Sequence, residues 1–114
     1  MTVDPFTERL ARVRQRFVET LTSKIEEAYA AVPQMVQDLP AVEEIYRSMH
    51  GIVGIGPIVG FPVTGRAARD VENILRPPRE VRRALTDSEV VALRNNLDAL
   101  RDAAQCELET SHSA

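Results

Sequence analysis

The sequence has one cysteine, few aromatic residues and no tryptophan. The single cysteine, Cys106, excludes a disulfide bond within the chain. Aromatic residues make up only 4% of the chain, so its core must be built from aliphatic side chains, which are plentiful because 44% of the residues are hydrophobic. Such a composition favours helices. We expect a single domain over residues 1–114, because this length supports one compact core.

Long apolar runs are also lacking. The longest stretch without a charged residue, 48–65, contains His50 and all five glycines of the chain, so it is too interrupted to span a membrane. The first residues carry charges where a signal peptide has apolar side chains. We therefore expect a cytoplasmic protein that does not contact a membrane.

The sequence has no long segment in which charges of one sign are concentrated. The 17 acidic and 14 basic residues are scattered and leave a net charge of −3, which argues against nucleic acid as a partner. The densest basic stretch, 76–83, contains four arginines and one glutamate. It is predicted to be a solvated turn, and its charge is suited to orienting an acidic partner.

Apolar residues recur every three or four positions along 6–32, which predicts one long amphipathic helix or two nearly collinear ones. Asp4 is suited to cap the start, and Pro33 is expected to mark the end, because proline disfavours helical geometry in the preceding residue. A second helix should begin near Asp38. Its predicted buried face consists of Val42, Ile45, Met49, Ile52, Gly56 and Val59.

Two more helices are expected. The third follows Phe61, and the pair Pro77-Pro78 should stop it. The fourth begins with a capping box of Thr86 and Glu89, and its end, at about 109–114, is expected to fray. Four amphipathic helices with short connections and no strand pattern predict an all-α fold, an antiparallel up-and-down four-helix bundle with a long N-terminal helix.

The glycine-rich stretch VGIGPIVG resembles the glycine fingerprint of dinucleotide-binding proteins. That fingerprint must follow a strand and open a helix within a βαβ unit. Here the preceding residues, AVEEIYRS, are strongly helical, and no parallel strand follows. The dinucleotide interpretation is therefore rejected, and the stretch is interpreted as a continuation of the second helix.

His50 lies on the polar side of this helix. At about 100° per residue, it is about 140° from Ile45 and beside Arg47 and Gly54, so it is predicted to be exposed; a buried core histidine is the alternative. Gly54, one turn later, leaves bare backbone beside the imidazole. A glycine within a helix costs about 0.5 to 1 kcal/mol relative to alanine, and close approach of another molecule would explain it.

The pattern of His50, Gly54, Gly60-Phe61 and the helical AARDVE ending at Glu72 resembles the histidine phosphotransfer (HPt) domains of bacterial multistep phosphorelays. The four-helix plan and the position of the histidine midway along the second helix agree with that family. The resemblance therefore covers nearly the whole chain.

The chain departs from the family pattern in three places. Ile52 and Val53 stand where HPt domains commonly have leucine and often lysine, so a cation that would offset phosphoryl charge is absent. Pro57 cannot donate its backbone hydrogen bond, and we expect a kink or an early end of the helix there.

The resemblance implies that His50 is the phosphoacceptor, because neutral imidazole is a nucleophile. It would take a phosphoryl group from a phospho-aspartate of a response-regulator receiver domain and pass it to another receiver. Glu72 would orient the imidazole, with a solvent-facing helix residue as the alternative. The implied partners are receivers and a hybrid histidine kinase. The receiver would supply Mg²⁺, so the chain would need no metal or cofactor of its own. It would be a phosphocarrier without autokinase activity, and we expect it to be a monomer.

A partly apolar patch around His50 is expected to dock the receiver: Tyr46, Arg47, Val53, Gly54 and Pro57. For Tyr46 and Val53, a place at the edge of the core is the alternative. A second function stays open, a four-helix adaptor that binds a receiver or a kinase without accepting phosphate. An autonomous kinase or metalloenzyme is disfavoured, because the sequence has neither a nucleotide loop nor a paired ligand set. The other histidine, His112, is expected to be an ordinary residue of the tail.

Overall fold

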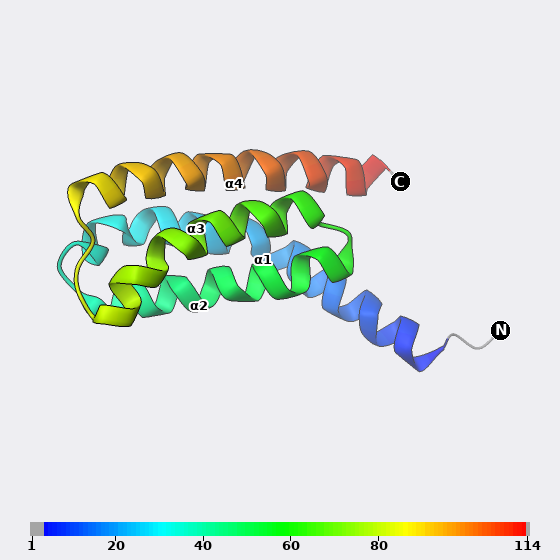
Figure 1. The fold of residues 1–114 in the computed structure, drawn as a ribbon. Coiled ribbons are helices and arrows are strands. Elements are labelled where there is room, and N and C mark those ends of the chain that lie inside the picture. The colour runs from blue at the N-terminus through cyan, green and yellow to red at the C-terminus, as the bar shows by residue number, and fades with distance from the viewer. Residues whose placement is uncertain (1–3, 114) are drawn as a thin grey trace.

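The computed structural model describes residues 4–113, which form four α-helices and one short 3₁₀ helix and contain no strand. The elements are α1 (Pro5–Met35), α2 (Leu39–Ile55), η1 (Gly56–Val59), α3 (Pro62–Val81) and α4 (Asp87–Ser113). Consecutive helices run in opposite directions and pack side by side (Figure 1). The predicted all-α, antiparallel up-and-down four-helix bundle is confirmed. No helix within residues 4–113 combines the length and the apolar character that a membrane crossing needs.

The core between the helices is aliphatic except for Phe17 and Phe61, whose ring centroids lie 5.1 Å apart. Each helix contributes one apolar stripe, as the sequence periodicity predicts. Among the fully buried side chains are Leu21, Val32, Met49, Ile52, Val71, Leu75, Leu93, Leu97 and Leu100. Burial of one such side chain stabilises the fold by about 1.5 to 3 kcal/mol, so the rotation of α2 about its axis is fixed by the residues that it buries.

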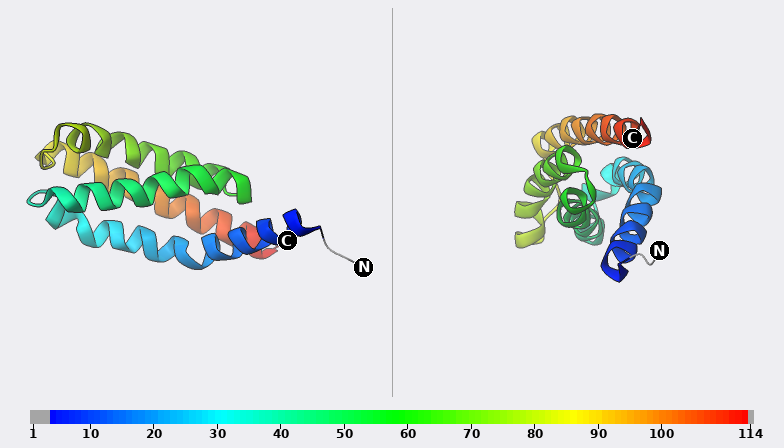
Figure 2. Two further views of the ribbon diagram at one scale, coloured as in Figure 1. Left: turned by 90° about the horizontal axis from the view of Figure 1, so that it is seen from below. Right: turned by 90° about the vertical axis from the view of Figure 1, so that its right-hand side faces the viewer.

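The first turns of α1 lie outside the bundle (Figures 1 and 2). Phe6 and Val13, which belong to the predicted buried stripe, are 68% and 41% exposed. The prediction that α1 ends near Pro33 is off by two residues. The helix continues to Met35, because that side chain is fully buried and its carbonyl accepts a hydrogen bond of 3.2 Å from the Leu85 amide.

The junction after α2 follows the expectation for Pro57. The α-helix ends at Ile55, and the chain continues as the 3₁₀ helix η1. Gly60 then adopts φ 93°, a left-handed conformation that glycine takes without a steric penalty. The Phe61 amide donates to the Gly56 carbonyl over 2.8 Å, which closes the turn into α3.

The pair Pro77-Pro78 does not stop α3, so that prediction is wrong. The helix continues to Val81 and ends with Arg82 in the left-handed conformation at φ 53°. Tertiary packing compensates for the two absent backbone donors, because Pro78 is buried among its neighbours. Beyond the prolines, Arg79 forms an ion pair with Glu43 of α2.

The start of α4 is capped as predicted. The Thr86 amide donates to Glu89 Oε1 over 2.9 Å, and the Glu89 amide donates to Thr86 Oγ1 over 3.2 Å. Within the described residues α4 continues to Ser113, and fraying over 109–114 stays a prediction. Leu108 packs against the core, and Arg14 of α1 donates a hydrogen bond to Ser111. Residue 114 and the side chain of His112 lie outside what the structure describes.

Candidate functional site

His50 lies on the outer face of α2, and its side chain is 70% exposed. The buried stripe of α2 turns Ile45, Met49 and Ile52 into the core and leaves the imidazole on the opposite side. The exposure predicted from the helical angle is therefore observed, and the core-histidine alternative is excluded. The imidazole Nδ1 lies 2.8 Å from Oε2 of Glu72 on α3.

Glu72 is buried, with only 3% of the residue exposed, so the alternative of a solvent-facing helix residue is wrong. Its other oxygen, Oε1, accepts a hydrogen bond of 2.9 Å from Arg76 Nη2, one turn later on α3. Both carboxylate oxygens are thus engaged, one by an imidazole and one by a guanidinium. When the imidazole is neutral, Nδ1–H donates to the carboxylate, and Nε2 keeps its lone pair free.

Tyr46 stands one turn before His50 on α2. The two rings are nearly parallel, with an interplanar angle of 10° and centroids 6.1 Å apart. The guanidinium of Arg79 lies 4.2 Å from the centroid of the same tyrosine ring. Tyr46 is half-buried and packs against the core, so it is both an edge of the core and a wall beside the imidazole.

The other predicted docking residues are all on the His50 side of the bundle. Val53 is half-buried against the core, whereas the Arg47 side chain is 77% exposed and forms an ion pair with Glu43. Gly54 and Pro57 are exposed. A Cβ added at Gly54 would meet no atom within 4 Å, so the backbone one turn after His50 is open to a visiting molecule.

Helix α1 contributes a surface that the sequence did not reveal. A hollow of about 300 Å³ next to His50 joins α1 to the residues Gly51 and Ile55 of α2. From α1 it is lined by Val13, Arg16, Phe17, Thr20 and Lys24. The sequence did not predict this apolar surface, because the periodicity assigns Val13 to the buried stripe of the helix.

Two cationic side chains of this hollow, Arg16 and Lys24, are relevant to the lysine that is missing after His50. The position three residues after His50 is Val53, which carries no charge. Lys24 of α1 lines the hollow together with Gly51, the residue after His50. Within residues 4–113, no group of three or more histidine, cysteine, aspartate or glutamate side chains is arranged to hold a metal ion.

Comparisons with known proteins identify one family. A family model described as Hpt domain matches residues 12–103, which covers most of the chain and includes every residue described above at the site. Searches of the curated proteins and of the solved structures find no significant match.

Proposed function

The chain belongs to the Hpt domain family and so has a histidine phosphotransfer role in phosphorelays; on that premise we propose that His50 is its phosphoacceptor. The donor would be a phospho-aspartate of a response-regulator receiver domain, and the acceptor would be the aspartate of a second receiver. The observation that carries this proposal is the exposed imidazole whose Nδ1 is held 2.8 Å from the buried carboxylate of Glu72.

The proposed step uses Nε2 of His50 as the nucleophile. Its lone pair attacks the phosphorus of the acyl phosphate, the bond between phosphorus and the aspartyl oxygen breaks, and the receiver's aspartate leaves as a carboxylate. The proton on Nδ1 stays in place, and the positive charge on the imidazolium ring is offset by Glu72. In the onward step, a carboxylate of the second receiver attacks phosphorus, and the neutral imidazole leaves.

Positioning and charge neutralisation supply most of the catalysis in phosphoryl transfer. In this proposal the chain supplies the nucleophile and its orientation, and Glu72 is a positioning residue. The receiver supplies Mg²⁺, so the chain needs no cofactor of its own. The proposal also gives the chain no autokinase activity. Hpt domains are phosphocarrier modules, which fits this division of labour.

The alternative is an adaptor that binds a receiver or kinase without accepting phosphate. One observation favours it: Val53 occupies the position where a lysine would offset phosphoryl charge. The two functions differ in a measurable product. Only the phosphocarrier forms a phosphohistidine, which is labile in acid and stable in base.

The test uses two phosphoryl donors, the small molecule phosphoramidate and purified phosphorylated receiver domains from the same genome. We expect intact-protein mass spectrometry to show one phosphoryl group on the wild-type chain and none on His50→Gln. Circular dichroism should show equal helicity for the two proteins, because His50 is exposed. Equal labelling of the wild type and His50→Gln would reject His50 as the phosphoacceptor. No labelling of the wild type by either donor would favour the adaptor function.

A further inference from the structure

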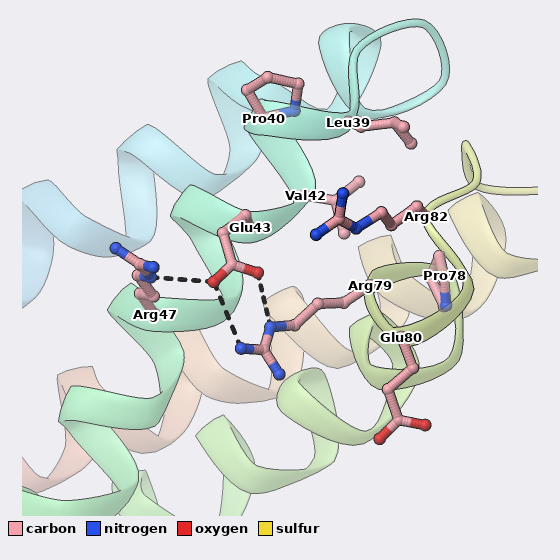
Figure 3. A pocket seen from close by; sticks show the side chains of 9 residues that line it. All are labelled: Leu39, Pro40, Val42, Glu43, Arg47, Pro78, Arg79, Glu80 and Arg82. Carbon is pink, nitrogen blue, oxygen red and sulfur yellow. Dashed lines mark hydrogen bonds and ion pairs between the residues drawn. The ribbon is translucent and has the colours of Figure 1, made fainter.

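A groove of about 540 Å³ lies between the beginning of α2 and the end of α3, and one of its lining residues, Arg47, stands one turn before His50 on α2. Leu39, Pro40 and Val42 form its apolar side. Arg79 and Arg82 extend into it from the end of α3 toward α2, whereas Glu80 points away from them (Figure 3). Arg47 closes the end of the groove nearest His50.

The three guanidinium groups of the groove are not equally paired. Glu43 accepts hydrogen bonds from Arg79 Nε over 2.6 Å and from Arg47 Nε over 2.9 Å. The hydrogen bond from Arg79 is the main cause that lowers the pKa of Glu43, so its carboxylate stays charged. Arg82 has no ion pair in the described part of the chain. The groove therefore carries excess positive charge on a protein whose net charge is −3.

Side chains connect this groove to the imidazole. The Arg79 guanidinium lies over the Tyr46 ring, and the His50 ring lies nearly parallel to the same tyrosine ring. Glu43 precedes His50 by two turns, or about 10 Å along the helix axis. A partner in a standard interface covers about 800 Å² on each side, so a receiver centred on His50 also covers Arg47 and reaches the groove.

Building on the proposed function, we propose that the groove is the second contact of the receiver domain. It favours receivers that carry an acidic segment beside their phospho-aspartate. Carboxylates of that segment pair with Arg82 and share Arg47 with Glu43, while apolar atoms of the segment contact the exposed side chains of Leu39 and Pro40. Contact at two points, the imidazole and the groove, fixes the orientation in which the receiver docks.

The test reverses one charge in the groove and one elsewhere. Arg82→Glu is compared with Arg94→Glu, which makes the same change on the exposed face of α4. The donors are phosphoramidate and the receiver that transfers fastest to the wild-type chain. We expect Arg82→Glu to slow transfer from the receiver about tenfold at low salt, and the difference to shrink at high salt. Labelling by phosphoramidate should be unchanged, and Arg94→Glu should match the wild type with both donors.

Arg82→Asn removes the charge without straining the backbone, because asparagine tolerates the left-handed conformation found there. It should slow receiver transfer about threefold. Equal receiver transfer by Arg82→Glu and Arg94→Glu would overturn the groove proposal and leave the phosphoacceptor intact. Absence of phosphoramidate labelling on the wild type would instead count against the proposed function. Self-association that Arg82→Glu abolishes, with transfer unchanged, would assign the groove to a second copy and overturn the proposal.

Discussion

Gly65, in the first turn of α3, lies against the ring of Pro57, and a Cβ added at Gly65 would be 2.9 Å from the ring's Cδ atom. Contact this close means that α3 and η1 can pack together only without a side chain at position 65. It also holds Pro57, two residues after the end of α2, against α3.

We predict that Gly65→Ala lowers the free energy of unfolding by about 1 to 3 kcal/mol, because the rigid proline ring and its backbone must move. Gly54→Ala is the matched control. It adds the same methyl group within a helix, but in open space, and should raise stability by about 0.5 to 1 kcal/mol. Urea unfolding measures the free energy of unfolding of both variants. A Gly65→Ala protein as stable as the wild type would contradict the close contact between Gly65 and Pro57.

Glu72 is predicted to set the orientation of the His50 ring. Glu72→Ala should slow labelling by phosphoramidate on the order of 10- to 100-fold, because the freed ring loses its orientation. Glu72→Gln keeps an oxygen that accepts from Nδ1–H and should be slowed only a few-fold. Nitrogen chemical shifts of the imidazole should show one tautomer in the wild type and a mixture in Glu72→Ala.

Two controls accompany the Glu72 variants. Glu80→Ala removes an exposed carboxylate from the same helix and should label at the wild-type rate. Thermal melting separates a loss of orientation from a loss of fold, because Glu72 is buried. Wild-type labelling rates in a folded Glu72→Ala protein would show that the carboxylate does not position the ring.

The bare backbone at Gly54 is predicted to admit the receiver. Gly54→Leu places a side chain in open space one turn after His50, so the fold should be retained. We expect transfer from a phosphorylated receiver to slow at least tenfold, because a misplacement of about 1 Å is enough for such losses. Phosphoramidate is small and should still label the variant. Asn95→Leu, on the exposed face of α4, is the control, and equal transfer by both variants would remove Gly54 from the docking surface.

The capping box of α4 is predicted to make the free energy of unfolding depend on pH in the acidic range. The hydrogen bond from Arg83, helped by those from Thr86, lowers the pKa of Glu89 from 4.5 to about 2. Because the folded state holds this carboxylate charged, its contribution is complete above about pH 4.5 and is lost as the pH falls toward 2.

Glu89→Gln should therefore lower the free energy of unfolding by about 1 to 2 kcal/mol at pH 7. The difference from the wild type should shrink as the pH falls from 4.5 toward 2, where the wild-type carboxyl is also neutral. Urea unfolding at several pH values measures it. Glu27→Gln, an exposed site without an ion pair in the described part of the chain, should change stability by less than about 0.5 kcal/mol. A pH-independent difference would show that charge on Glu89 is not the cause.

Local patterns predicted much of the fold and part of the site. The apolar spacing of α2 was enough to place His50 outside the core, because a helix has a fixed rotation per residue. The capping box could also be predicted from the sequence, because Thr86 and Glu89 are only three positions apart. Predictions failed where distant residues outweighed a local preference. Helix α3 continues through Pro77-Pro78 because Pro78 is buried.

The sequence by itself determined four amphipathic helices and one exposed imidazole beside bare backbone, because these features depend only on the order of residues within one helix. The tertiary structure decided which groups from other helices reach that imidazole. Glu72 comes to 2.8 Å from His50 across 22 positions of sequence, and α1 brings Val13 and Lys24 to the hollow beside it. Such contacts depend on how the helices rotate and cross as they bury their shared core, and no periodicity within a single helix specifies that arrangement.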